Sequence, residues 1–246
     1  MMMMKMWSRC VVLCLLSALL LFLLQSVEGF NLETANHVRH NGPSSSMFGF
    51  TVATYKERGN SWVLVGAPEA QNDYQPTVRR GGAVYRCTIG EDDNCQMVPF
   101  DRKGSNLDTQ GREIDNKSGQ WFGATLNSAG ENGPVVACAP RYVYFTNKRD
   151  RREPVGTCYV SRGEFQSFSE YSPCRTALHG YHRHGSCQAG FSAAISNDGE
   201  RLFSGNPGAW YWQGQVNSID AQASFPYTPG KFGGAFGSGQ VVQQSL

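Results

Sequence analysis

A short β-rich unit recurs three times along the chain, and this repetition constrains the fold more than any other feature. The clearest copy runs from Cys187 to Val216 and reads CQAGFSAAISNDGERLFSGNPGAWYWQGQV. Turn residues such as Asp-Gly, which supply the positive φ of a tight hairpin, separate its runs of strand-forming residues. We therefore predict an antiparallel meander in this copy, with strands at Phe191–Ile195, Arg201–Ser204 and Ala209–Trp212.

The three copies share the same ordered features. Each begins at a glycine, Gly49, Gly123 or Gly190, and a proline closes the second strand 19, 17 and 17 residues later. A third strand that ends on an aromatic residue follows, and we predict it at Gly82–Tyr85, Gly156–Tyr159 and Gly208–Tyr211. Units of this size that cannot bury both faces alone are typical of β-propeller blades. Chance recurrence of turn residues in an ordinary β-sandwich is the alternative.

Several longer stretches resemble the head of an integrin alpha subunit. They read FGFTVATY, QWFGATL, ACAPRY, REPVGTC and CQAGFS followed by YWQGQ, and the similarity runs from Phe30 to about Val216. REPVGTC and YWQGQ are far more specific than the glycine repeat. The lack of an inserted domain, together with YWQGQ, resembles the branch of the family that binds Arg-Gly-Asp ligands.

This resemblance implies an all-β fold. Residues 30–246 would form about three blades of a seven-bladed β-propeller, each a four-stranded antiparallel sheet. The repeats would occupy about 30–105, 106–172 and 173–246, and the propeller would be incomplete within this sequence.

The function that the resemblance implies is cell adhesion. The chain would pair with an integrin beta subunit and recognise an extracellular matrix protein, as the outer part of a single-pass plasma-membrane receptor. A soluble secreted propeller, either a glycan-binding module or a hydrolase-associated domain, is the alternative. We expect no enzyme activity, because no nucleophile elbow, P-loop or pair of catalytic carboxylates occurs. The net charge is only +2, and the sequence lacks the basic stripe that is typical of a nucleic-acid binder.

Residues 1–29 have the composition of a signal peptide. Lys5 and Arg9 precede an apolar run of 14 residues from Val11 to Leu24. That run is shorter than the roughly 20 residues of a membrane span, so we predict cleavage near Phe30. An uncleaved anchor is the alternative.

The cysteines are consistent with an oxidising compartment. Two of the eight cysteines lie in residues 1–29, and the six others form an even set that suits disulfides. Six cysteines can pair in many ways, and no Cys-x-x-Cys spacing indicates zinc. Local spacing favours three pairs, and the resemblance implies the same ones: Cys87–Cys95, Cys138–Cys158 and Cys174–Cys187.

Polar segments between the predicted strands are interpreted as solvated connections, and the longest is Asp101–Ser118. It ends in a glycosylation sequon at Asn116. The basic run Lys148–Arg152, KRDRR, is interpreted as an exposed connection rather than a heparin site, because it is short.

Three histidines lie close together in the sequence, at His179, His182 and His184, and could bind a transition metal. The stretch between Cys174 and Cys187 contains no acidic residue that would orient them, so we predict no metal there. Calcium loops need closely spaced Asp and Asn residues around a glycine, and this pattern is missing as well. The resemblance implies that calcium binds in later blades, beyond residue 246.

Three aromatic residues, Phe50, Trp121 and Phe191, lie near the repeat glycines where the innermost strands begin. Innermost strands line the central channel of a propeller, so these rings would converge near the axis. The resemblance implies that they surround a basic side chain of the beta subunit. Ordinary packing between blades is the alternative.

The resemblance also implies a ligand site that contains Gly180 and Tyr211. Tyr211 matches an aromatic residue that flanks the ligand in Arg-Gly-Asp-binding relatives. Gly180 takes the place of an acidic residue that holds the ligand's arginine there, so the charge-assisted pair is lost. The neighbouring basic residues would oppose an arginine, and we expect a weaker hold on it.

Overall fold

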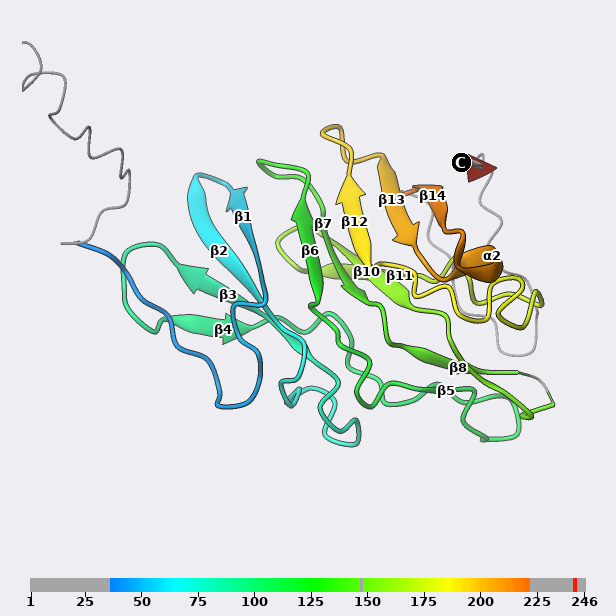
Figure 1. Ribbon diagram of the computed structural model, residues 1–246. Helices are drawn as coiled ribbons and strands as arrows, with labels where there is room; N and C mark the ends of the chain where they lie inside the picture. Colours follow the sequence, from blue (N-terminus) through cyan, green and yellow to red (C-terminus); the bar gives the residue numbers. More distant parts are fainter. Residues whose placement is uncertain (1–35, 147, 222–240, 243–246) are drawn as a thin grey trace, which may run out of the picture. The chain divides into compact units, whose positions relative to one another are not determined.

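Antiparallel β-strands make up almost all of the regular structure in the computed structural model, which describes residues 36–146, 148–221 and 241–242 (Figure 1). Every described strand belongs to a compact unit that starts at Val38. The predicted signal peptide, residues 1–29, lies outside the described residues. Within the described ranges, no helix has the length and apolar character needed to cross a membrane.

The first repeat is a meander of four strands in the order β1-β2-β3-β4. Arg58 and Gly59 form the two-residue turn of the first hairpin, and both have positive φ, 47° and 82°. The bounds of the strands are Thr51–Glu57 (β1), Asn60–Ala67 (β2), Ala83–Thr88 (β3) and Cys95–Met97 (β4).

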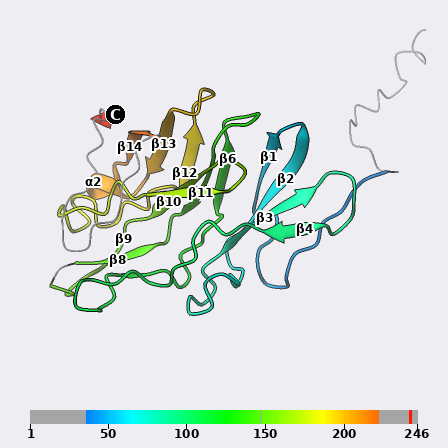
Figure 2. The same ribbon diagram turned by 180° about the vertical axis from the view of Figure 1, so that it is seen from behind.

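The second repeat is also a four-stranded sheet, in the order β11-β10-β7-β6. Its strands are Thr125–Ser128 (β6), Val135–Ala139 (β7), Thr157–Arg162 (β10) and Ser167–Tyr171 (β11). The chain between β7 and β10 leaves this sheet and forms β8 and β9 (Figure 2). These two strands join β5, which precedes β6 in the sequence, in a second, three-stranded sheet with the order β5-β8-β9. The strands of the second sheet are Asp115–Asn116 (β5), Val143–Phe145 (β8) and Arg152–Pro154 (β9).

The three-stranded sheet corrects one prediction. Asp101–Ser118 is not a solvated connection throughout, because β5 lies in this segment and the side chains of Asp115 and Lys117 are buried. Charged residues tolerate burial when they are paired and hydrogen-bonded, and both have such partners. Sequence pattern misses them because charged residues in a polar segment without hydrophobic periodicity look like a loop.

The third repeat has the order β12-β13-β14-β15, with strands Ser192–Ile195 (β12), Arg201–Asn206 (β13), Gln215–Asp220 (β14) and Val241–Val242 (β15). The predicted strand at Ala209–Trp212 is wrong, because these residues form the short turn α2. Their backbone N–H groups form hydrogen bonds outside the sheet: the Trp210 N–H donates to the Arg183 carbonyl and the Tyr211 N–H to the Tyr181 carbonyl. The third strand therefore begins only after Gly214.

Successive repeats are joined by the same contacts. Strand β6 touches both β1 and β12. The Thr51 hydroxyl donates to the Gly123 carbonyl at 2.7 Å, and the Thr125 hydroxyl donates to the Gly190 carbonyl at 2.8 Å. Parallel bridges, which link Gly82 to Phe122 and Gly156 to Ala189, also recur. This regularity argues against chance recurrence, and the predicted all-β partial propeller of four-stranded antiparallel blades is confirmed.

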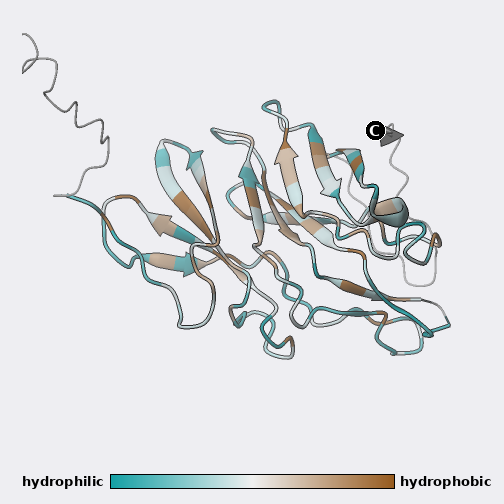
Figure 3. Ribbon diagram, in the orientation of Figure 1, coloured by the Kyte–Doolittle hydropathy of each residue, from teal (hydrophilic) through white to brown (hydrophobic). Residues whose placement is uncertain are grey.

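The apolar core lies between the sheets. Strand β7 is buried along its whole length, and its alternate residues enter different clusters. Val135 and Ala137 pack toward the first repeat, with Leu64 and Val84, whereas Val136 packs toward the third. Because successive side chains of a strand point to opposite faces, one central strand can serve both interfaces. Figure 3 shows the hydrophobic residues concentrated within the strands.

All three predicted disulfides are present. Cys138 and Cys158 are directly opposite each other on β7 and β10, and Cys87 and Cys95 are opposite on β3 and β4. The Cys174–Cys187 bond closes the loop of residues 175–186, which we call the ligand loop.

Candidate functional site

The aromatic residues near the repeat glycines lie in three equivalent tight turns. The N–H of the fourth residue donates to the carbonyl of the first: Phe50 to Met47, Ala124 to Trp121 and Phe191 to Gln188. Phe50 and Phe191 therefore occupy the same position of their turns, directly after the glycine. Trp121 occupies the first position of its turn, with a φ of 63°.

The structure brings two of these three aromatic residues together. The Phe50 and Trp121 rings lie edge to face, 5.6 Å apart, and the Arg141 guanidinium lies 5.0 Å above the Trp121 ring. Neither of the two rings contacts that of Phe191. Phe50 thus packs between the first two repeats and is still 47% exposed, and Phe191 is 63% exposed. An exposed ring face can accept a cation from another molecule.

A second group of exposed rings lies where the ligand loop meets α2. The Tyr181 ring stacks on Trp212 at 5.6 Å and 15°, and it meets Tyr211 edge to face at 5.7 Å. Each of these three side chains is more than half exposed. We call them the aromatic patch. Backbone hydrogen bonds from Trp210 and Tyr211 to the ligand loop hold the two segments together.

Gly180, which precedes Tyr181 of this patch in the sequence, is buried. Its φ is 87°, and its N–H donates to the Glu153 carboxylate at 2.7 Å. Glu153 also accepts a contact from the His179 ring at 3.0 Å. This carboxylate comes from β9, outside the ligand loop, so an acidic residue orients His179 although none lies between Cys174 and Cys187. The one available sequence signal was the glutamate of REPVGTC.

The three histidines of the ligand loop have different surroundings. His184 is buried, its Nδ1 lies 3.2 Å from the Thr176 hydroxyl, and its ring meets the Trp210 ring at 5.5 Å. Burial lowers the pKa of His184 because it disfavours the charged imidazolium. His182 lies toward the Tyr211 ring instead, at 6.1 Å.

Among the described residues, one group of three potential metal ligands lies within 4.8 Å, formed by His40, Cys87 and Cys95. The two sulfurs are bonded to each other as a disulfide, so they are not thiolates that could hold a metal.

A buried polar network supports the start of the ligand loop. The Arg175 guanidinium donates to both oxygens of Glu170, at 2.9 and 3.2 Å, and to the Tyr142 hydroxyl at 2.9 Å. Tyr142 in turn donates to Asp115 at 2.7 Å. Burial alone would raise the pKa of Glu170, but the attraction of Arg175 outweighs it and the pKa lies below its usual value. Glu170 is therefore ionised, and the pair anchors the loop next to Cys174.

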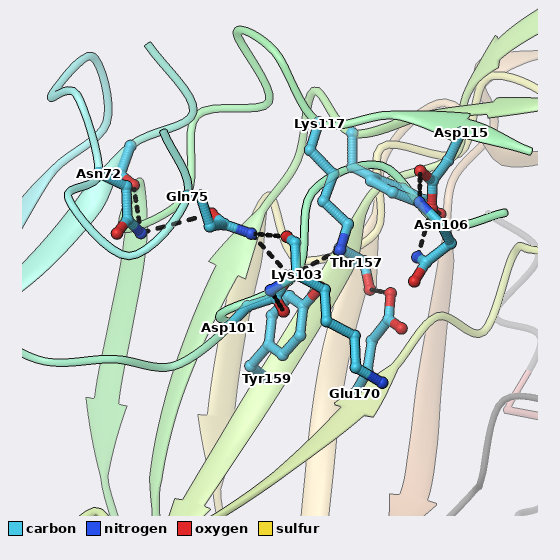
Figure 4. Close-up of polar contacts among 12 residues, drawn as sticks. Asn72, Gln75, Asp101, Lys103, Asn106, Asp115, Lys117, Thr157, Tyr159 and Glu170 are labelled. Atoms are coloured by element: carbon cyan, nitrogen blue, oxygen red, sulfur yellow. Dashed lines mark hydrogen bonds and ion pairs between the residues drawn. The ribbon is translucent and has the colours of Figure 1, made fainter. Parts of the chain in front are cut away.

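A second buried polar cluster lies beside this one, toward the first repeat (Figure 4). The Lys117 ammonium, which is almost fully buried, lies 2.6 Å from the Asp101 carboxylate. Gln75 and Tyr159 also donate to Asp101, at 2.9 and 3.2 Å. A buried charge with this many partners is costly to disrupt, since removing one partner leaves the others unpaired.

Asn116, the predicted glycosylation site, lies half-buried on β5. Its side-chain oxygen accepts the Ser118 N–H at 2.9 Å. Attachment of a glycan there stays a prediction.

A comparison with models of protein families finds no match. Among curated proteins, the chain is 47% identical over 224 residues to integrin alpha-PS2 of Drosophila melanogaster, which covers 87% of the chain and 16% of that protein. It is 45% identical to integrin alpha-5 of Xenopus laevis over 209 residues, 82% of the chain and 19% of that protein. It is 39% identical to integrin alpha-V of Gallus gallus over 203 residues, which cover 82% of the chain and 19% of that protein. The chain thus spans less than a fifth of the length of these relatives.

Proposed function

The chain belongs to the integrin alpha-subunit family, and from this premise we propose that its protein is a cell-adhesion receptor subunit and not an enzyme. It pairs with an integrin beta subunit and contributes to recognition of an extracellular matrix protein. This region faces the outside of the cell at the plasma membrane. Any calcium of the complete protein is bound in later blades.

The pairing surface proposed is the exposed face around Phe50, Trp121 and Phe191. The observation that carries it is the exposure of Phe50 and Phe191 at equivalent turns of different blades. Aromatic side chains bury about 150–250 Å² each and are enriched among the residues that dominate binding energy. A basic side chain of the partner adds a cation–π contact worth about 2 kcal/mol when it is desolvated.

The matrix ligand is proposed to lie against the aromatic patch, with Tyr211 as its principal contact. An Arg-Gly-Asp ligand is held less firmly here than in relatives with an acidic ligand loop, because Gly180 offers no carboxylate. A Gly180→Asp variant should raise affinity for such a peptide. Its Cβ would lie 2.7 Å from the His182 ring and 3.1 Å from the Arg151 guanidinium, so the His182 side chain must shift to admit it, and the new carboxylate would then offset local positive charge. Asp tolerates the positive φ of this position better than most residues.

Co-expression of the full-length chain with a beta subunit tests both proposals. We expect the two chains to co-purify, and we expect Tyr211→Ala to reduce adhesion to an Arg-Gly-Asp surface while pairing stays at the wild-type level. Phe203→Ala, which removes an exposed ring from β13, serves as the control and should leave adhesion unchanged. Failure of the two chains to co-purify would contradict the pairing proposal. Unchanged adhesion of the Tyr211→Ala variant would show that Tyr211 is not part of the ligand site.

A further inference from the structure

A cavity of about 440 Å³ lies between the β8–β9 connection and the ligand loop. Its size falls in the range of small-molecule sites, which is about 300–1,000 Å³. Most of its wall is basic. The charged and titratable residues that line it are Lys148, Asp150, Arg151, His179, His182 and Arg183.

The basic run KRDRR divides between two sides of the β8–β9 connection. The guanidinium groups of Arg149 and Arg152 lie 5.9 and 5.5 Å from the Phe145 ring, and Arg149 also donates to the Glu113 carbonyl. Lys148 and Arg151 line the cavity instead. The run is therefore not one continuous basic strip, and only part of it contributes to the cavity.

A second segment supplies the remaining cation. Arg183 comes from the ligand loop, more than thirty residues away in sequence, and its carbonyl is fixed by the Trp210 N–H at 2.7 Å. The shortness of the basic run argued against an anion site when the sequence was considered alone. The fold removes that objection, because it adds Arg183 and two histidines to the same cavity.

The charges of the cavity do not cancel. Lys148, Arg151 and Arg183 carry permanent positive charge, and Asp150 carries the single carboxylate in the wall. The Thr146 hydroxyl donates to Asp150 at 2.6 Å and holds the pKa of that carboxyl below its usual value, so Asp150 is ionised. Its contact with Arg151 is long, 4.0 Å, and both side chains are exposed. Among the described residues, the side chains of Lys148 and Arg183 make no ion pair.

We propose that this cavity binds sulfate groups of a sulfated glycan of the extracellular matrix. Sulfate is always ionised and presents several acceptor oxygens, which suits guanidinium and ammonium donors from two segments. The cavity is open and larger than a single carboxylate requires, and its His182 edge adjoins the aromatic patch, whose flat exposed rings can lie against sugar rings. The inference rests on the proposed function, because it needs this face of the chain to meet the matrix.

Binding of a heparin oligosaccharide to the full-length chain, purified with its beta subunit, tests the inference. Wild type should bind the sulfated oligosaccharide and not the same oligosaccharide after removal of its sulfates. Lys148→Gln with Arg151→Gln should weaken binding by about tenfold or more, and Arg183→Gln alone by about tenfold, as expected for lost charge-assisted hydrogen bonds. Gly180→Asp should also weaken binding, the opposite of its effect on an Arg-Gly-Asp peptide.

The matched control is Arg149→Gln with Arg152→Gln, which removes the same charge from the same run outside the cavity. We expect it to change binding by less than about twofold, because these two guanidinium groups lie at the Phe145 ring and not in the cavity wall, and exposed charges without direct contact are screened by salt. Equal losses in the two double variants, or no loss in Arg183→Gln, would overturn the proposal. The proposal would also be overturned if the protein bound an acidic peptide and not the sulfated oligosaccharide. Co-purification with the beta subunit, measured in the same samples, reports separately on the proposed function.

Discussion

At the scale of single residues, Arg175 connects the buried network to the ligand loop. It is mostly buried and bonded to Glu170 and to Tyr142, directly after the cysteine that begins the loop. Sequence pattern did not single out Arg175 or Glu170, because a lone charge in a polar stretch looks solvated. The disulfide at Cys174 could be predicted, since cysteine spacing and secretion constrain it.

Arg175→Met should destabilise the protein by about 3–5 kcal/mol, because it leaves the Glu170 carboxylate buried without its cation. Chemical unfolding of the purified protein measures this. Lys56→Met is the control: Lys56 pairs with Glu131 at 3.0 Å, but the side chains are 48% and 52% exposed. Removing that pair should cost less than about 1 kcal/mol. Equal effects of the two variants would show that the network does not anchor the loop.

His184 makes the ligand loop sensitive to acid. Burial lowers its pKa in the folded protein, so the unfolded loop takes up a proton more readily. Stability of the loop therefore falls as pH drops below about 6.5, the ordinary pKa of histidine. Fluorescence of Trp210, whose ring meets His184, should change between about pH 7.5 and 5. His184→Gln should abolish this change and His182→Gln should preserve it; the same titration in His184→Gln would contradict the assignment.

At the scale of elements, the sequence predicts strands well where hydrophobic alternation and turn residues agree. β12 and β13 lie within two residues of their predicted bounds. Prediction failed at α2, although the residues there are aromatic and favour strands. Tertiary hydrogen bonds to the ligand loop outweighed that local preference, and Trp210, Tyr211 and Trp212 all adopt positive φ. A local sequence pattern cannot reveal these hydrogen bonds, because they join segments that are far apart in the sequence.

The bridge between the second and third repeats depends on Gly156. A Cβ at this position would overlap the backbone of Ala189, and φ is 72°. Gly156→Ala should therefore cost several kcal/mol and lower the secreted yield. Gly59→Ala has a similar φ of 82° but open space around it, so it should cost only about 1–2 kcal/mol of conformational strain. Similar unfolding free energies for the two variants would contradict a close approach between these repeats.

At the scale of the whole molecule, the repeated blades place equivalent turns side by side. Phe50 and Phe191 follow the repeat glycine and are exposed, whereas Trp121 stands three residues earlier in its turn and packs against Phe50. Because the repeat is regular, the sequence predicts that these residues lie in equivalent turns, but the structure brings only Phe50 and Trp121 into contact. The sequence does not predict that Arg141 covers the Trp121 ring, since that contact depends on the path of the chain after β7.

Co-purification of the full-length chain with an integrin beta subunit tests the pairing most directly. Phe50→Ala, Trp121→Ala and Phe191→Ala should each lower the yield of the complex by about tenfold or more, as expected for hot-spot residues. Ile89→Ala, which trims an exposed apolar side chain between β3 and β4, should leave the yield unchanged. Secretion and unfolding of each variant are measured alongside. Variants that fold normally and still co-purify at the wild-type yield would contradict a pairing surface built on these rings.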